Sequence, residues 1–223
     1  MKRTNIITLI TLVQTFIMGA IDAFTFQNYD GSFVSAQTGN LVLFGYELIR
    51  DGWTTASLRI PVLIGFLLGA FLSQPLTNDD IHLKSQTKTN LLISITILTI
   101  TLILLIVNVD RLLILFILGG FSGFELTAFS TIGKTKVNNG IMTGNLKNFA
   151  NNLYETIFNH DNNAKIATIN FALGILFFVM GVVASAQWLS ARAILLFPIL
   201  IIFNSGLVIL AIFFKKEVDT YQK

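Results

Sequence analysis

The sequence predicts an all-α membrane protein, in which six transmembrane helices form two inverted three-helix repeats. Hydrophobic residues make up 53% of the chain and charged residues only 12%, and the mean hydropathy is +0.72. This balance is far from that of a soluble domain. Six apolar runs are candidate membrane spans. The motif Thr-Gly-Asn-Leu occurs at 38–41 and again, 105 residues later, at 143–146.

The composition also excludes several function classes. The chain has no cysteine, so disulfides, thiolate zinc sites and cysteine nucleophiles are absent. The formal charge of +3 is typical of basic cytoplasmic loops rather than of nucleic-acid binding. No phosphate-binding loop, zinc-protease motif or nucleophile elbow occurs, so we expect neither enzymatic activity nor a cofactor. His82 and His160 have no second ligand at metal-binding spacing, and no metal is predicted.

The apolar runs are separated by polar, turn-forming segments. The first run follows Lys2 and Arg3, so a cleaved signal peptide is the alternative. Its length and the lack of a small-x-small cleavage site favour a span. Each run approaches the length that covers about 30 Å of hydrocarbon at about 1.5 Å per residue. The six runs lie near 6–26, 58–73, 91–107, 112–132, 166–189 and 193–214.

The distribution of basic residues predicts both the number of spans and their orientation. With six spans and both termini in the cytoplasm, the lysines lie in cytoplasmic segments. Only Arg50, Arg59, Arg111 and Arg192 then fall outside. Counting the two Thr-Gly-Asn segments as further spans would give eight, place Lys147 within the membrane and weaken the bias. The positive-inside rule therefore favours six spans.

The repeat extends well beyond the shared motif. The same shift aligns the Ala-Phe pairs at 23–24 and 128–129 and the Leu-Gly pairs at 68–69 and 173–174. Several matches in one register indicate a duplicated unit. Three spans per unit is an odd number, so the second copy enters the membrane from the opposite side, as in many secondary transporters. The two predicted repeats of this single membrane domain are 1–109 and 110–223.

Each repeat contains a Thr-Gly-Asn segment, at 31–49 and 138–158, that is predicted to form a short helix. Between Leu146 and Ile157 the apolar residues recur at helical spacing, opposite polar residues such as Lys147. Threonine or asparagine at a helix start can cap free amides, and glycine allows a ligand close to the backbone. Each helix either re-enters the membrane, with its N–H groups toward a polar or anionic group, or lies on the membrane surface.

The sequence therefore predicts a solute site near the membrane midplane, where the two segments approach each other. Asp22 and Glu125 lie within spans, where a charge costs about 2.5–3.5 kcal/mol at the bilayer centre. They are predicted to carry a coupling ion, with a proton as the main candidate. The alternative is that neighbouring hydroxyl or amide groups satisfy them structurally. The predicted substrate-binding residues are Gln37, Thr38, Gly39, Asn40, Thr143, Gly144 and Asn145.

Glycines at helical spacing predict close helix packing. Gly65 and Gly69 form one such pair, and Gly119 and Gly123 form another. Small residues let two helices approach closely in lipid, where no hydrophobic force drives their association. Ser122 adds to the small face of the fourth span, and the alternative for that face is a cavity lining.

Three stretches of the chain resemble a known family. These are Gly19-x-x-Asp22-Ala23-Phe24, the segment 35–40 and the segment 142–146. Together they resemble the YoaK-like family of bacterial integral membrane proteins, also described as domain of unknown function 1275, over nearly the whole chain. The resemblance implies a bacterial inner-membrane protein and supplies no substrate. Glu125 departs from the family pattern, in which an amide is expected.

The predicted function is secondary transport of a small polar or anionic solute. The lipid bilayer and the solute are the expected partners, nucleic acid is not, and a homo-oligomer is compatible with the sequence. A channel-like pore is one alternative, and it would conduct without coupling to a gradient. A membrane scaffold or assembly protein is another, and no solute would stabilise it.

The topology can be tested with single cysteines in this cysteine-free chain. We expect Asp51→Cys to react with a membrane-impermeant maleimide added to intact cells, because 31–55 is predicted to be external. Asn159→Cys should react only after the membrane is permeabilised. Labelling of position 159 but not of position 51 in intact cells would overturn the predicted orientation.

Overall fold

A computed structural model describes residues 3–76, 83–188 and 193–220. Six helical segments of the described chain are long and apolar enough to cross a membrane, which confirms the predicted number of spans. The chain thus has the helical architecture of a multi-pass membrane protein. The six segments are Asn5–Asn28, Trp53–Leu76, Gln86–Ile106, Arg111–Ala128, Asn162–Gln187 and Ala193–Phe213.

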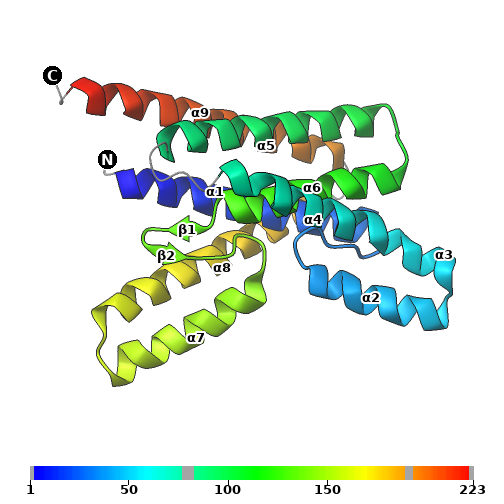
Figure 1. Ribbon diagram of the computed structural model, residues 1–223, viewed down its shortest axis with the longest axis horizontal. Coiled ribbons are helices and arrows are strands. Elements are labelled where there is room, and N and C mark those ends of the chain that lie inside the picture. The colour runs from blue at the N-terminus through cyan, green and yellow to red at the C-terminus, as the bar shows by residue number, and fades with distance from the viewer. Residues whose placement is uncertain (1–2, 77–82, 189–192, 221–223) are drawn as a thin grey trace.

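The helices and strands follow one another as Figure 1 labels them. Short 3-10 turns at 57–59, 74–76 and 193–195 extend neighbouring helices, and α3 continues through the first of these turns into α4. The elements are α1 (Arg3–Asn28), α2 (Gln37–Arg50), α3 (Trp53–Ala56), α4 (Ile60–Ser73), α5 (Leu83–Ile106), α6 (Arg111–Ala128), β1 (Thr131–Ile132), β2 (Thr135–Lys136), α7 (Met142–Phe158), α8 (Asn162–Trp188) and α9 (Leu196–Thr220).

The fourth predicted span is too long at its C-terminal end. The helix stops at Ala128, and the residues that were expected to continue it form an antiparallel hairpin of β1 and β2. Gly133 turns this hairpin with a φ of +62°, a conformation that favours glycine. The Gly133 N–H donates to Thr8 Oγ1 of α1 over 2.8 Å, and Asn170 Nδ2 of α8 donates to Ile132 O over 3.1 Å. These tertiary hydrogen bonds hold the hairpin against α1 and α8, and a hydropathy pattern does not predict them.

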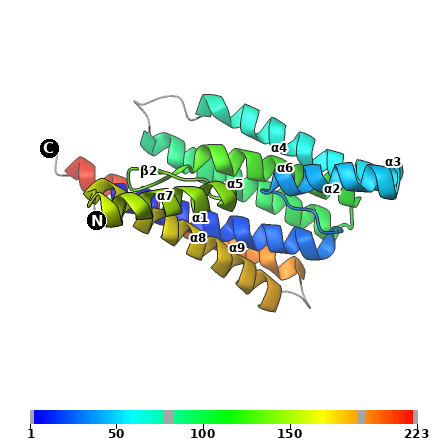
Figure 2. The same cartoon turned by 90° about the horizontal axis from the view of Figure 1, so that it is seen from below.

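Helices from the two halves of the chain pack on each other. α1 lies along α8, α4 lies along α6, and α5 lies along α9, as Figures 1 and 2 show. At the crossing of α1 and α8, a Cβ atom added to Gly19 would lie 2.1 Å from Phe178 O, and one added to Gly181 would lie 2.0 Å from Phe16 O. Only glycine permits this approach of the two backbones.

The crossing of α4 and α6 uses the two predicted glycine pairs. A Cβ on Gly65 would lie 2.0 Å from Phe116 O, and one on Gly69 would lie 1.9 Å from Gly120 O. From the other helix, a Cβ added to Gly119 would lie 2.4 Å from Val62 O, and one added to Gly123 would lie 2.1 Å from Phe66 O. The glycines of this crossing therefore serve helix packing, as predicted.

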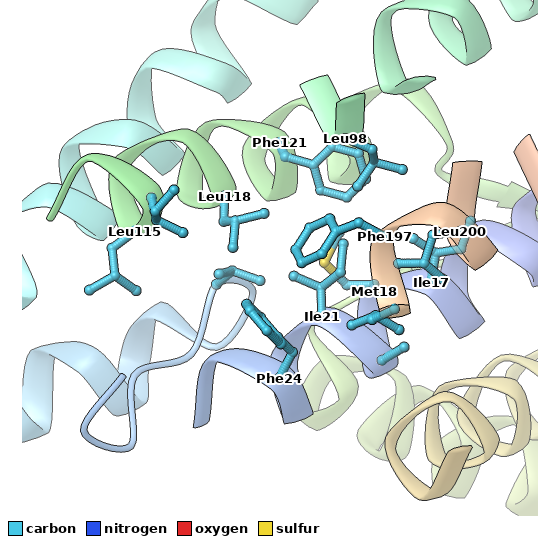
Figure 3. Packing of buried hydrophobic residues seen from close by; sticks show 14 of the residues in the cluster. Ile17, Met18, Ile21, Phe24, Leu98, Leu115, Leu118, Phe121, Phe197 and Leu200 are labelled. Atoms are coloured by element: carbon cyan, nitrogen blue, oxygen red, sulfur yellow. The ribbon is translucent and has the colours of Figure 1, made fainter. Parts of the chain in front are cut away.

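An apolar core joins the central helices. Phe121 and Leu118 of α6, Ile17 and Ile21 of α1 and Phe197 of α9 are all buried and belong to one cluster. Figure 3 shows these side chains converging from the three helices. Val34, in the loop that precedes α2, belongs to the same cluster.

Helices α2 and α7 extend toward opposite ends of the molecule. In Figures 1 and 2 α2 reaches one end together with α3, and α7 reaches the other end, where the first helix begins and the last helix ends. The N-terminal ends of α2 and α7 both lie toward the middle. This arrangement brings the segments before the two Thr-Gly-Asn motifs together.

The glycine contacts predict a selective loss of stability. Gly69→Ala should lower the unfolding free energy by about 1–3 kcal/mol, because its methyl group would collide with the backbone of Gly120. Thermal unfolding of the purified protein measures the change. Gly206→Ala in α9 is the control, since no atom lies within 4 Å of the added Cβ. Equal melting temperatures for the two variants would contradict the packing role.

Candidate functional site

The two loops that precede α2 and α7 contact each other. Ser35 Oγ lies 2.9 Å from Gly140 O, as donor to acceptor, and both groups are buried. These positions are separated by 105 residues, the same shift that relates the two Thr-Gly-Asn motifs. Equivalent positions of the two predicted repeats thus touch at the centre of the molecule.

The motif asparagines hold these loops to their helices. Asn40 Oδ1 accepts a hydrogen bond of 3.1 Å from Phe33 N, and Asn40 Nδ2 donates to Phe33 O over 2.5 Å. Asn145 makes the same pair with the peptide groups of Asn138, over 3.0 and 2.5 Å. Each side chain therefore pairs the N–H and C=O of the residue seven positions earlier, an arrangement that we call the asparagine clasp.

The clasp occupies the polar groups that were predicted to bind solute. Asn40 also donates to Gln37 Oε1, and Gln37 Nε2 donates to Val34 O, so both amides bond within the loop. The side chains of Thr38 and Thr143 are exposed. The structure thus brings only part of the predicted binding set toward the centre.

The two helix starts differ from the capping expectation. Helix α2 begins at Gln37 and α7 begins at Met142, so each Thr-Gly-Asn triplet lies inside the first turns. The N-cap residues are Ala36 and Ile141, and neither makes a side-chain capping bond. The motif asparagines instead bond to the backbone of a loop residue that lies three positions before the N-cap residue. Asparagine is a common N-cap residue, but here its side chain holds a loop.

The motif glycines lie against the residues that the clasps hold. A Cβ added to Gly39 would come within 3.2 Å of the Phe33 ring, and one added to Gly144 within 3.3 Å of Asn138 Nδ2. Both glycines are helical and neither has a positive φ. Their small size accommodates the loop, so a strained turn does not explain the glycine.

Asp22 holds the first loop from the side of α1. Asp22 Oδ1 accepts hydrogen bonds from Val34 N and Ser35 N over 2.8 and 3.0 Å, and Oδ2 accepts one from Ser35 Oγ. The side chain is buried, with 4% of the residue exposed. A carboxylate that accepts two backbone N–H groups takes the place that an external anion would occupy.

A cavity of about 420 Å³ lies beside Asp22, between α1, α8 and the two loops. Ala36 from the first loop and Gly140 from the second both line it, and Thr143 adds a hydroxyl from the second motif. Its volume is within the range of ligand sites, roughly 300–1,000 Å³. The remaining lining residues are Ala23, Phe26, Gln27, Phe33, Met142, Phe178, Val182 and Ala186.

Glu125 lies in a different environment on α6. It is fully buried, Ser94 Oγ is hydrogen-bonded to its Oε1, and its Oε2 has no hydrogen-bond partner among the described residues. Asn139 Nδ2, in the loop before α7, donates to the backbone oxygen of Glu125 over 3.1 Å. A buried carboxyl group without a counter-charge is expensive in the bilayer, which distinguishes this site from an ordinary structural contact.

Sequence reasoning missed a third buried ionisable group within a span. Arg59 is 3% exposed and forms an ion pair with Glu47 of α2. Its Nε donates to Glu47 Oε2 over 3.0 Å, and its Nη2 donates to Glu47 Oε1 over 2.5 Å. Its Nη1 donates to Ser32 Oγ over 2.6 Å. The pairing compensates both charges. Nothing in the local sequence links these residues, because the contact spans the turn between α2 and α3.

The described residues contain no cluster of histidine and acidic side chains able to hold a metal ion. His160 lies in the short connection between α7 and α8. His82 and Arg192 lie outside the described residues.

The asparagine clasp predicts that the motif stabilises the loops. Asn40→Ala and Asn145→Ala should each lower the unfolding free energy by about 1 kcal/mol, since each leaves two partly buried backbone groups without their partners. Thermal unfolding and amide exchange at 33 and 138 measure the effect. Asn151→Ala, at an exposed position of α7, is the matched control. If the motif variants behave like this control, the clasp has no stabilising role.

Comparison with known proteins places the chain in a family. The model of the family described as protein of unknown function (DUF1275) matches residues 10–213. No curated protein and no solved structure matches the chain. The match confirms the predicted membership of DUF1275, and the matched region contains both loops, both Thr-Gly-Asn motifs, Asp22 and Glu125. The chain belongs to the family of proteins of unknown function DUF1275.

Proposed function

We propose that this protein is a secondary transporter of a small polar solute, with the cavity beside Asp22 as its binding site. The observation that carries the proposal is the contact between the two loops, Ser35 to Gly140, at the wall of a cavity that both loops line. A solute in this cavity would touch both halves of the chain. Its binding could therefore depend on how the halves are arranged, as transport requires.

The geometry favours a polar solute over an anionic one. The anion prediction relied on free N–H groups before the Thr-Gly-Asn helices. Asp22 already accepts the N–H groups of Val34 and Ser35, and it adds a negative charge to the cavity wall. Of the predicted binding residues, Thr143 lines the cavity, while Gln37, Asn40 and Asn145 support its walls through the clasps.

We also infer that the halves 1–109 and 110–223 are inverted repeats. The order of helices supports this: α1, α2, α4 and α5 correspond in sequence to α6, α7, α8 and α9. In this correspondence the α1–α8 pairing is the equivalent of the α6–α4 pairing, and both crossings rest on glycine against carbonyl oxygen. The asparagine clasps repeat at the same shift. In this arrangement α2 and α7 are re-entrant helices from opposite membrane faces, in a cytoplasmic membrane with both termini inside.

Glu125 is the residue we propose to carry a coupling proton. Ser94 Oγ has one hydrogen but two acceptors, Asn90 O at 3.0 Å and Glu125 Oε1. One hydrogen cannot serve both. A proton on Glu125, donated to Ser94 Oγ, supplies the missing hydrogen and removes the cost of a buried charge. An ionised Glu125 would instead take the Ser94 hydrogen away from Asn90 O.

The surroundings of Glu125 provide no compensating cation among the described residues. Helix α4 carries no ionisable side chain, and in α1 Asp22 is bonded to the first loop. Lys88 of α5 and the hairpin residues Lys134 and Lys136 are exposed. Asn139 connects the site to the loop that lines the solute cavity. Loss or gain of the proton could thereby alter the cavity wall.

A thermal-shift screen against a metabolite library tests the proposed function directly. A solute that binds only the folded protein raises its apparent stability. We expect one class of small polar compounds to stabilise the purified protein and to be taken up by proteoliposomes. A screen without any stabilising solute, together with co-purification of a stable protein partner, would instead support a scaffold.

The proton role predicts a separable defect. Glu125→Gln should leave solute binding intact but abolish proton movement driven by that solute, because an amide cannot release a proton at this position. A pH-sensitive dye inside proteoliposomes measures the proton flux. Glu155→Gln makes the same chemical change at an exposed position of α7 and should behave as the unaltered protein. Undiminished proton flux in Glu125→Gln would exclude this carrier.

A further inference from the structure

We propose that the solute is an amphipathic organic cation, an ammonium group attached to an aromatic or similarly compact apolar body. This inference rests on the proposed function, because it assigns a substrate class to the same cavity. Its basis is the combination of a buried carboxylate without a counter-cation and a largely aromatic and aliphatic wall.

The charge of the cavity wall is negative and uncompensated. Asp22 is the one ionisable side chain among the described residues that line the cavity. The ion pairs of the described chain, Arg59 with Glu47 and Arg111 with Asp30, do not include it. Asp22 accepts three hydrogen bonds, two of them from backbone N–H groups, which suits the ionised carboxylate. A buried carboxylate without a paired cation favours a cationic ligand.

Asp22 retains one place for a hydrogen-bond donor. The two oxygens of a carboxylate offer about four lone-pair positions. Val34 N and Ser35 N occupy Oδ1, while Ser35 Oγ is the single described donor to Oδ2. The Ser35 hydrogen also has a second acceptor in Gly140 O, at 2.9 Å. An ammonium group at Oδ2 could therefore bond to the carboxylate while Ser35 turns its hydrogen to Gly140, which tightens the contact between the loops.

The apolar part of the wall suits the body of such a solute. Phe26 and Phe33 are stacked with their ring centroids 5.2 Å apart, and both line the cavity. Phe178 and Val182 of α8 line it as well. Aromatic faces attract cations as well as apolar groups, so the same wall accommodates both parts of the molecule. Two further cavities among the described residues, near 490 and 390 Å³, have no ionisable residue in their lining, which fits contact with lipid chains instead.

Three probes that each carry a phenyl ring on a short alkyl chain test the effect of charge. These are phenethyltrimethylammonium, phenethyl alcohol and phenylacetate, which are cationic, neutral and anionic at every pH near neutrality. We expect the ammonium compound to stabilise the purified protein in a thermal-shift titration and to bind more tightly than the alcohol by about 30-fold or more. Phenethylamine should bind in the same way and, in addition, donate a hydrogen bond to Asp22.

Two variants locate the effect. Asp22→Asn should abolish the preference for the cation over the alcohol, because the amide removes the charge at nearly constant volume. Since Asp22 also holds the first loop, Phe33→Leu provides a second test that leaves the carboxylate in place. It should reduce the binding free energy of the ammonium compound by more than it reduces the unfolding free energy of the protein without ligand.

The outcomes distinguish this inference from the proposed function. Equal binding of all three probes, tighter binding of phenylacetate, or stabilisation by none of them would overturn the organic-cation class. An unaltered cation preference in Asp22→Asn would also overturn it. The transporter proposal would survive each of these results if the metabolite screen finds another solute, and it would fail if that screen finds none.

Discussion

The structure depends on the need to pair every backbone polar group that is buried in the interior. A helix meets this need by itself, but the loops before α2 and α7 do not, because they enter the interior as irregular chain. Side chains supply the missing partners. Asn40 and Asn145 each pair the N–H and the C=O of one loop residue, and Asp22 accepts two further N–H groups. These bonds hold the two loops where they contact each other and line one cavity.

This constraint explains what the sequence could predict of the site and what it could not. The repeated motif pointed to two loops that touch, since each Thr-Gly-Asn triplet lies in the first turn of a helix and the loops before these helices are in contact. It did not reveal the role of the asparagines. An asparagine that binds a solute and one that bonds to the backbone of a loop look the same in a sequence. The partners, Phe33 and Asn138, lie seven positions earlier and have no feature in common except a backbone.

The fold was more predictable than the site, because a membrane span requires a long apolar run that can be read directly from the sequence. Runs of apolar residues located all six spans, and glycine spacing located the crossing of α4 and α6. The hairpin after Ala128 was missed since its short strands are held by tertiary bonds from Thr8 and Asn170. The ion pair of Arg59 and Glu47 was missed for the same reason. In each case a residue more than ten positions away determines the local structure.

The two acids within the spans differ in their hydrogen-bond donors rather than in their burial, and this difference is the basis of the two proposed roles. Both are almost fully buried, so their desolvation cost is similar in kind. In both sites a serine hydroxyl faces the carboxyl group and a backbone oxygen as well. Asp22 accepts two backbone N–H groups in addition, which stabilises a charge and lets it attract a cation. Glu125 has no such N–H donor among the described residues, and its Oε2 has no hydrogen-bond partner there. A site with too few hydrogens favours a proton, and a site with enough of them favours a charge. Since Asn139 links Glu125 to the loop whose Gly140 meets Ser35, a proton at one acid and a cation at the other would act on the same short segment of chain.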